Sequence, residues 1–576
     1  MKSHQVLPGG FFHASHLRYK RYWLFAALSL SILGMSTTAS QDQQRVELDA
    51  IVIGAGFSGM YQLLSLRDKL GMDVKVLEAG DGVGGTWYWN RYPGARCDSE
   101  SHSYMFYFSK EMVNEWTWTE RYPQQPEILR YLNHVADRFD LRRNIQLNTR
   151  VESARYDEAT QRWHVRTQGG QHFVAQFLIT GVGCLSTANV PNIPGLNDFK
   201  GQWVHTGQWP HEGVDFTGKR VGVIGTGSTG IQTIPVVAAQ AKHLTVFQRT
   251  ANYSIPARNA PLSDAFKRYA KEHAEGIRYI MNTNTNAHPF RMVERSVLAT
   301  HPAEREAIME AAWIKGGLEF RAAFKDTLAD AGANKVVADF IRKKIKQIVQ
   351  DPAVAELLSD IDHPFAAKRP PVDSHYFETF NRDNVSLVNI RATPIERITA
   401  EGIQTKDQVY PLDIIIFATG FDAMTGSLLK IDIQGRQGVK LKDTWAAGPI
   451  NYLGLQVPGF PNMFTITGPG SPSVLCNLPP AIEQHVDWIT HCIRTLREQG
   501  MSTIEATEPA SQTWCEEVNR AAQASLLGQV KHSWYLGANV PGKPQVFMPY
   551  AGGFGKYSEI CREVAADHYR GFALSA

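Results

Sequence analysis

Residues 48–60 read LDAIVIGAGFSGM, and this stretch decides the fold class of the chain. An apolar strand runs directly into Gly54, Gly56 and Gly59, which have the spacing G-x-G-x-x-G. The first glycine permits a tight turn, the second lets a pyrophosphate approach the backbone, and the third lets a helix pack against the strand. The amino end of that helix then faces the phosphates. The stretch therefore predicts a strand, turn and helix that bind a dinucleotide.

The residues after this turn narrow the choice of dinucleotide. A helical stretch, YQLLSLRDKLG, leads to a second apolar strand, VKVLEAG, in which Glu78 follows the last apolar residue. A carboxylate at roughly 20 residues beyond the glycines accepts hydrogen bonds from ribose hydroxyls. The plainer interpretation, a solvated glutamate after a strand, does not account for this spacing. We expect the first site to bind FAD.

The same device occurs again in residues 219–232, KRVGVIGTGSTGIQ. Its turn comprises Gly225, Thr226, Gly227, Ser228 and Gly230. The next strand, HLTVFQRT, ends in Arg249 and Thr250 and lacks an acidic residue. A carboxylate would repel a 2′-phosphate, whereas Arg249 can pair with it. We expect the second site to bind NADPH, and two dinucleotides in one chain imply electron transfer between them.

The rest of the chain fits an α/β protein with two Rossmann-like dinucleotide-binding domains and a helical insertion. Residues 257–366 have helical periodicity and charged faces, while strand patterns return near residue 385. The predicted divisions are an N-terminal extension (1–44), FAD-binding segments (45–183 and 419–576), NADPH-binding segments (184–256 and 367–418) and the helical insertion (257–366).

Composition excludes several other classes of function. Apolar residues make up 43% and charged residues 20% of the 576, which is ordinary for a globular protein. The net charge of +3 gives no reason to expect a nucleic-acid partner. The six cysteines include no C-x-x-C pair, so neither a zinc site nor a disulfide reductase is indicated. We expect no metal.

The first 44 residues differ from the rest. A basic start precedes an apolar run over residues 22–35, shorter than the roughly 20 residues that span a bilayer. Three interpretations stay open. The protein begins at Met35 and is cytoplasmic, which we favour; or the segment exports it; or the segment anchors it to a membrane. Membrane contact is expected only if residues 1–34 are retained.

Three loops carry side chains suited to chemistry. Residues 84–100, GGTWYWNRYPGARCDSE, contain aromatic residues that can stack on a flavin and end near Asp98. Lys368 and Arg369 stand before two prolines, which restrict where the guanidinium can point. A fixed arginine suits a negatively charged oxygen species. Residues 532–544, HSWYLGANVPGKP, form a Gly/Pro loop around Trp534 that is able to open and close over a site.

The connector between the two glycine turns, FKGQWVHTGQWP at residues 199–210, contains one imidazole, His205, among aromatic residues. His205 has no second ligand at metal spacing, and a general-base role is the weaker alternative. The favoured interpretation is mechanical, because aromatic packing at a hinge gives two defined positions instead of a floppy joint.

Together these motifs resemble type I Baeyer–Villiger monooxygenases. Phe199, Gly201, His205, Trp209 and Pro210 match that family's F-x-G-x-x-x-H-x-x-x-W-P signature, and GGTWYWNRYPGARCD matches its second signature. The resemblance runs from about residue 45 to the end of the chain. It implies an FAD- and NADPH-dependent monooxygenase that activates O2 as a flavin C4a-peroxide and converts a ketone to an ester or lactone.

The resemblance also implies roles for individual residues. Arg369 would stabilise the anionic oxygen species, and Asp98 would orient Arg369. His205 of the first signature is counted with them as a candidate catalytic residue, in the mechanical role described above. The implied FAD contacts are Gly54, Gly56, Gly59, Glu78, Thr86, Trp87, Asp98, Tyr104 and Val151. The implied NADPH contacts are Arg96, Asp98, the second glycine turn, Arg249, Thr250, Lys368 and Trp534.

Two rival functions remain open. A flavin monooxygenase that forms N- or S-oxides would share both nucleotide sites, but the H-x-x-x-W-P ending and the Lys368–Arg369 pair argue against it. A non-catalytic NADPH-binding protein would keep the glycine turns and have no use for Asp98 with Arg369.

Overall fold

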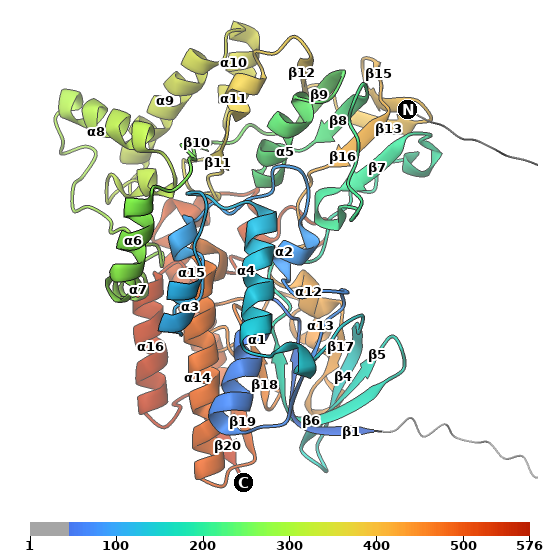
Figure 1. The fold of residues 1–576 in the computed structure, drawn as a ribbon, viewed down its shortest axis with the longest axis vertical. Helices are drawn as coiled ribbons and strands as arrows, with labels where there is room; N and C mark the ends of the chain where they lie inside the picture. Colours follow the sequence, from blue (N-terminus) through green and yellow to red (C-terminus); the bar gives the residue numbers. More distant parts are fainter. Residues whose placement is uncertain (1–44) are drawn as a thin grey trace, which may run out of the picture. The chain divides into compact units, whose positions relative to one another are not determined.

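The computed structural model describes residues 45–576 (Figure 1). The strands are β1 (Val46–Ile53), β2 (Val74–Leu77), β3 (Ile145–Gln146), β4 (Val151–Asp157), β5 (Arg162–Thr167), β6 (His172–Thr180), β7 (Gln202–His205), β8 (Arg220–Ile224), β9 (His243–Gln248), β10 (Ile255–Pro256), β11 (Val372–Asp373), β12 (Val385–Asn389), β13 (Ile395–Thr399), β14 (Gly402–Thr405), β15 (Val409–Pro411), β16 (Ile414–Phe417), β17 (Asp432–Gln434), β18 (Met463–Thr465), β19 (Thr503–Ala506) and β20 (Phe572–Ser575). The α-helices are α1 (Phe57–Leu64), α2 (Thr86–Trp89), α3 (Lys110–Glu115), α4 (Gln125–Arg138), α5 (Ser228–Ala238), α6 (Asp264–Glu272), α7 (Ala274–Thr283), α8 (Pro302–Lys315), α9 (Ala331–Ile348), α10 (Pro352–Ser359), α11 (Tyr376–Thr379), α12 (Gly426–Leu429), α13 (Leu441–Thr444), α14 (Leu478–Glu498), α15 (Glu508–Gln523) and α16 (Phe554–Ala566).

The first sheet has the strand order β17-β4-β5-β6-β1-β2-β3, and β18 pairs with β6 beside this path. β1 lies between β2 and β6 and is parallel to both, with Ile53 level with Leu77 and with Thr180. Residues 50–53 of β1 form a continuous, buried apolar run, because a central parallel strand is covered on both faces. β1, β2 and β6 therefore end at the same edge of the sheet, beside the turn that begins with Gly54.

The second sheet is wholly parallel, in the order β12-β9-β8-β16-β7. β8 leads through the second glycine turn into α5, and β9 follows α5. Each sheet thus contains a strand–turn–helix–strand unit. The predicted fold class, two Rossmann-like units with a helical insertion, is confirmed. The residue limits of the domains remain predictions.

The helical insertion packs on two separate cores. Ile277 and Met281 of α7 belong to the core that contains β1, α14 and α16. Met309 and Trp313 of α8, together with α9, belong to the core of the second sheet. The sequence predicted these helices as one insertion between the two NADPH-binding segments. The structure divides their packing between the two nucleotide-binding units.

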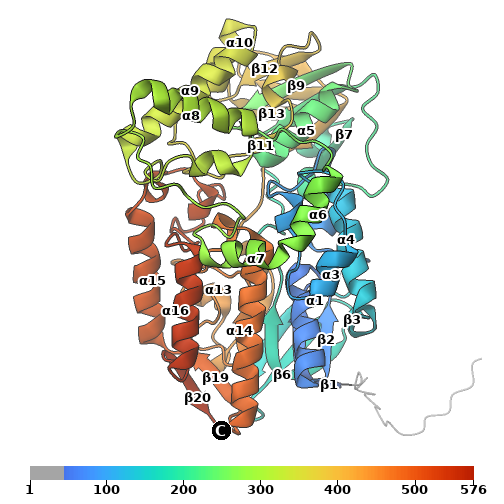
Figure 2. The same cartoon turned by 60° about the vertical axis from the view of Figure 1, so that its left-hand side comes forward.

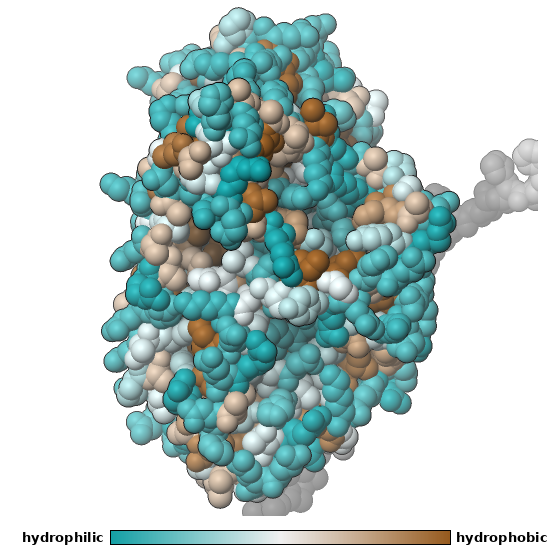
Figure 3. All heavy atoms as spheres, turned by 90° about the vertical axis from the view of Figure 1, so that its left-hand side faces the viewer, coloured by the Kyte–Doolittle hydropathy of each residue, from teal (hydrophilic) through white to brown (hydrophobic). Residues whose placement is uncertain are grey.

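The C-terminal part supplies long helices on the side of the first sheet. α14 and α16 lie side by side (Figure 2), and Trp488 of α14 donates from Nε1 to the carbonyl of Cys561 at 2.9 Å. Polar residues cover most of the face in Figure 3, with apolar residues in small groups. Within residues 45–576, no helix combines the length and apolar character needed to cross a membrane. The predicted leader or anchor lies outside the described residues.

Candidate functional site

The first glycine turn is packed so closely that side chains are excluded. Gly54 has φ +99°, a conformation that L side chains rarely adopt. A Cβ on Gly59 would stand 1.7 Å from the Gly54 carbonyl oxygen, and one on Gly54 would stand 2.6 Å from the Gly181 oxygen. The backbones of the strand, the turn and the helix are therefore in direct contact. This geometry lets a pyrophosphate approach the backbone of the turn and the amino end of the helix.

Glu78 is fixed beside this turn. Its side chain accepts hydrogen bonds from the backbone N–H groups of Ala55 and Gly80, each at 2.7 Å, and the residue is buried. Because a carboxylate accepts several hydrogen bonds, it can still receive ribose hydroxyls. The position and chemistry of Glu78 fit the adenosine end of FAD.

The other predicted FAD contacts lie around the same strand ends. Trp87 donates from Nε1 to the hydroxyl of Tyr104 at 3.2 Å, and the two rings meet edge to face. Thr86 is the exposed first residue of α2. Val151 begins β4, just after Thr149, whose N–H donates to the Glu78 carbonyl at 2.7 Å.

The second glycine turn repeats the geometry of the first. Gly225 has φ +113°, and a Cβ on Gly230 would stand 2.2 Å from the Gly225 oxygen. Gly227 has open space at its Cβ position, so backbone is accessible there. Thr226 Oγ1 donates to the carbonyl of Thr250 at 2.8 Å, which links the turn to the end of β9. Ser228 begins α5.

Three cations gather near the end of β9. Burial lowers the pKa of Lys368, the charges of Arg249 and Arg391 lower it further, and only Asp362 opposes them. Arg391 donates to Thr250 Oγ1 at 3.3 Å and to Asp362 at 2.6 Å. The sequence predicted Arg249, Thr250 and Lys368 for a 2′-phosphate but missed Arg391. The order of strands in the sheet would have indicated Arg391, because this residue follows β12, which pairs in parallel with β9.

Asp98 and Arg369 form a bidentate ion pair. Arg369 donates from Nε to Oδ2 at 2.8 Å and from Nη2 to Oδ1 at 2.9 Å, and from Nη1 to the carbonyl of Val474 at 3.3 Å. The side chains are 13% and 27% exposed for Arg369 and Asp98. Residues 271 positions apart in the chain are thus brought together as the sequence predicted.

This pair stays charged in spite of its burial. Burial alone would raise the pKa of Asp98, but the charge and hydrogen bonds of Arg369 outweigh it and hold that pKa below its usual value. Burial would likewise lower the pKa of Arg369, and Asp98 raises it above its usual value. The site therefore holds a permanent, oriented guanidinium whose remaining donors can face a negative oxygen.

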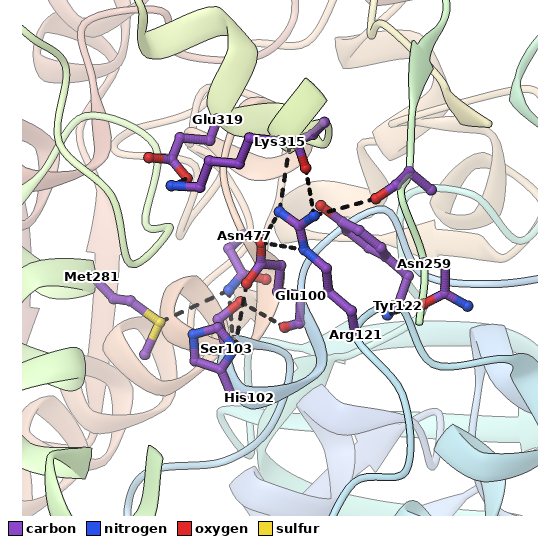
Figure 4. Close-up of polar contacts among 12 residues, drawn as sticks. Glu100, His102, Ser103, Arg121, Tyr122, Asn259, Met281, Lys315, Glu319 and Asn477 are labelled. Carbon is purple, nitrogen blue, oxygen red and sulfur yellow. Dashed lines mark hydrogen bonds and ion pairs between the residues drawn. The ribbon is translucent and has the colours of Figure 1, made fainter. Parts of the chain in front are cut away.

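A second arginine supports the segment that carries Asp98 (Figure 4). Arg121 donates from Nε and Nη2 to Glu100 at 2.9 and 2.6 Å. Its Nη1 donates to the carbonyl of Lys315 at 2.7 Å, and its Nη2 donates to that of Gly316 at 3.4 Å. These carbonyls end α8, where the helix dipole favours a cation. Arg121 therefore joins the Asp98 segment to the helical insertion.

We expect Arg121→Met to destabilise the protein by roughly 2–3 kcal/mol, because hydrogen bonds to charged groups are worth that much. The conformation of the Asp98 segment should also loosen, so that less product of the monooxygenase reaction implied by the family resemblance should form per NADPH consumed. Thermal unfolding of the holoenzyme and the product-to-NADPH ratio measure the two effects. Arg520→Met, which removes an exposed pair with Glu517, is the control. An unchanged product ratio would limit Arg121 to a structural role.

The loop around Trp534 lies beside Arg369. The rings of Trp534 and Tyr535 are tilted by 54° against each other with centroids 4.5 Å apart, and both residues pack in a cluster that contains Val474. Lys543 ties the loop down by donating to Asp422 and to the carbonyl of Ala423. The contact of Trp534 with nicotinamide stays a prediction.

His205 lies apart from the Asp98–Arg369 pair. It is the last residue of β7, is 1% exposed, and accepts from the N–H of Gly207 through Nδ1 at 2.9 Å. Burial lowers its pKa to about 4, so the imidazole is neutral at physiological pH. Its ring meets Phe421 edge to face in the segment where the chain returns to the first sheet. This position favours the mechanical interpretation of His205 over the general-base interpretation.

Two more residues near Arg369 escaped the sequence analysis. Arg321 and His288 both belong to the helical insertion, and the charges of Arg369 and Asp98 act on the pKa values of both. No local motif marks either residue. Among residues 45–576, no three His, Cys, Asp or Glu side chains are grouped to hold a metal ion.

Known proteins similar to this chain are flavin-dependent monooxygenases, and they include Baeyer-Villiger enzymes and a phenazine N-monooxygenase of Lysobacter antibioticus that is 42% identical over 536 residues. Residues 48–259 match the FMO-like family model, described as flavin-binding monooxygenase-like. A Baeyer-Villiger monooxygenase of Pseudooceanicola batsensis is 44% identical over 526 residues, covering 91% of this chain and 95% of that protein. Cyclohexanone 1,2-monooxygenase of an Acinetobacter species is 43% identical over 538 residues, covering 92% and 97%. A solved structure of an oxidized steroid monooxygenase bound to NADP is 52% identical, with a TM-score of 0.88, covering 92% of this chain and all of that one.

Proposed function

The chain belongs to the Baeyer–Villiger monooxygenases, and from this premise we propose that it inserts one oxygen atom of O2 beside a ketone carbonyl to give an ester or lactone. FAD and NADPH are its cofactors, as the flavin-binding family and the NADP-bound structural neighbour indicate. The observation that carries the proposal is the bidentate Asp98–Arg369 pair, which keeps one oriented cation in a largely buried site.

We propose that the first glycine turn and Glu78 hold FAD, with Thr86, Trp87, Asp98, Tyr104 and Val151 around it. NADPH is held by the second glycine turn, Arg249, Thr250 and Lys368, with Arg96, Asp98 and Trp534 towards its nicotinamide end. Arg391 joins the set that binds the 2′-phosphate. The domain limits predicted from the sequence belong to the same proposal.

The residues of the chain contribute binding, orientation and charge. Reduced FAD supplies the activation of O2. Arg369 places its guanidinium donors where negative charge develops on oxygen, and Asp98 holds those donors in one orientation. The Trp534 loop excludes water from the site. His205 transmits the relative movement of the two nucleotide-binding units through its packing on Phe421.

A ketone panel tests this function. Cyclic, aromatic and long-chain ketones should stimulate NADPH consumption, and mass spectrometry should show products one oxygen atom heavier that hydrolyse to an alcohol and an acid. Amines and thioethers of matched size serve as comparison substrates. If only N- or S-oxides form, the rival monooxygenase function is correct. If no compound stimulates NADPH consumption, the non-catalytic interpretation stands.

We also propose a cytoplasmic location. All six cysteines are free in the structure, and five of them are buried. Unpaired cysteines are typical of proteins kept in a reducing compartment.

A further inference from the structure

One guanidinium beside the candidate catalytic pair has no hydrogen-bond or ion-pair partner among residues 45–576. Arg321 lies in a short 3-10 turn, η6 (Leu318–Ala322), within the helical insertion. Its Nε is buried and donates to no atom of the described residues. The pKa of Arg321 is lowered to about 10, by burial first and by Arg369 next, with Tyr535 and Asp98 opposing. All three groups that act on Arg321 belong to the candidate site.

Packing places this turn next to the segment that carries Arg369. Phe320, which precedes Arg321, meets Phe365 edge to face with ring centroids 5.7 Å apart. The chain then runs from Phe365 through Lys368 to Arg369. Phe320 is buried in the core of the second sheet, which fixes the backbone of its neighbour. The packing of Phe320 therefore fixes the backbone of Arg321 close to the segment that carries Arg369.

A second unpartnered polar group lies in the same place. His288 is 2% exposed, its ring stacks on Phe290, and its Nε2 has no hydrogen-bond partner among the described residues. Burial and the charge of Arg369 lower its pKa to about 3, and Arg321 and Asp98 also act on it. The imidazole is therefore neutral and able to donate one hydrogen bond or accept one.

The charges around these groups do not balance. Both oxygens of Asp98 already accept from Arg369, which leaves Arg321 as a surplus positive charge. A buried guanidinium N–H without an acceptor is costly, because buried polar groups are almost always hydrogen-bonded. Such a group is expected where a ligand supplies the missing charge. Arginine matches a carboxylate with two parallel N–H donors.

The proposed contacts of the cofactor phosphates do not include Arg321. The phosphates of NADPH are assigned to the Gly225 turn and to Arg249, and those of FAD to the Gly54 turn. The remaining molecule that enters the site is the ketone. We propose that Arg321, assisted by His288, binds a carboxylate on the ketone substrate, so that the enzyme prefers keto acids to neutral ketones. This inference rests on the proposed function and names its substrate class.

A matched pair of substrates tests this specificity. The probes are a cyclohexanone carboxylate and its methyl ester, which share one carbon skeleton and differ in charge. With the wild-type holoenzyme, kcat/KM should favour the acid roughly tenfold or more, the range expected of hydrogen bonds to a charged group. The difference should lie in KM. Arg321→Gln should lose most of this ratio, and Arg321→Lys should keep part of it.

A binding measurement separates recognition from chemistry. Isothermal titration of the oxidised holoenzyme with the cyclohexanone carboxylate, without NADPH, should give a dissociation constant at least tenfold weaker in Arg321→Gln. FAD content verifies that each variant is folded. Arg497→Gln is the matched control, because its Nη1 donates to the carbonyl of Leu70, far in sequence from this cluster.

Three results would overturn the inference. In the first, the wild type oxidises the methyl ester as well as the acid. In the second, Arg321→Gln lowers kcat equally for both compounds. The second result would make Arg321 a general electrostatic support of Arg369. The third result is unchanged binding of the acid by a folded Arg321→Gln holoenzyme. If neither compound nor any neutral ketone yields an oxygenated product while the acid still binds through Arg321, the proposed reaction fails and the anion site stands.

Discussion

Replacing Arg369 by alanine is expected to lower ester formation roughly 100- to 1,000-fold while NADPH is still oxidised. Removing one preorganised donor from a site of developing negative charge commonly has this effect. NADPH oxidation should persist because the predicted contacts of the 2′-phosphate, Arg249, Thr250 and Lys368, are untouched. The measurement is the molar ratio of ester formed to NADPH consumed, with hydrogen peroxide assayed alongside.

The same substitution also leaves Asp98 without its partner. Arg369 supplies the largest influence that opposes burial at Asp98, so the pKa of Asp98 should rise in the variant. Breaking a buried pair from one side costs roughly 3 kcal/mol or more. The double variant Asp98→Asn with Arg369→Ala should recover much of that stability and none of the ester yield. If the double variant restores the ester, the loss in the single variant came from misfolding and the role of Arg369 is wrong.

The pH dependence of this pair has a definite sign. The folded-state pKa of Asp98 lies below its usual value, so the pair stabilises the protein above the unfolded-state pKa of an aspartate, near 4. That contribution is lost as the pH falls through the depressed folded-state pKa. At neutral pH the pair is fully charged, and the orientation of Arg369 does not vary.

The parts of the site that the sequence predicted are those encoded by local spacing. Gly54 and Gly59, like Gly225 and Gly230, are five residues apart and shape one turn each, so the pattern alone implies their contact. The charge difference between Glu78 and Arg249 is likewise local, because each residue follows the second strand of its unit. The second family signature then indicated Asp98, and the family resemblance indicated Arg369 as its partner, although no spacing in the chain would have joined the two.

The residues that escaped prediction depend on tertiary contacts. Arg391 reaches the NADPH site only because β12 pairs with β9. Arg121 draws its role from Glu100 and the end of α8, nearly 200 residues later in the chain. Arg321 stands in a segment that the sequence identified only as helical and charged. A lone arginine on a charged face is ordinarily solvated, and only the packing of Phe320 on Phe365 distinguishes this one.

The two glycine turns should fail separately when each is blocked. Gly59→Ala places a methyl group 1.7 Å from the Gly54 oxygen, and Gly230→Ala places one 2.2 Å from the Gly225 oxygen. Neither backbone can move aside without opening its turn, because each turn joins a buried strand to a helix. We expect Gly59→Ala to be purified without FAD and therefore colourless.

Gly230→Ala should be purified yellow, with FAD bound, and its KM for NADPH should rise at least tenfold. Flavin absorbance per polypeptide and the rate of anaerobic flavin reduction by NADPH measure the two losses. Gly276→Ala is the control, because a Cβ there meets nothing within 4 Å and alanine favours the helix by about 1 kcal/mol. Loss of FAD from Gly230→Ala would contradict the assignment of NADPH alone to the second turn. Retention of FAD by Gly59→Ala would contradict the assignment of FAD to the first turn. Separate losses would tie each cofactor to its own turn, because the substitutions are chemically identical and differ only in the sheet they disturb.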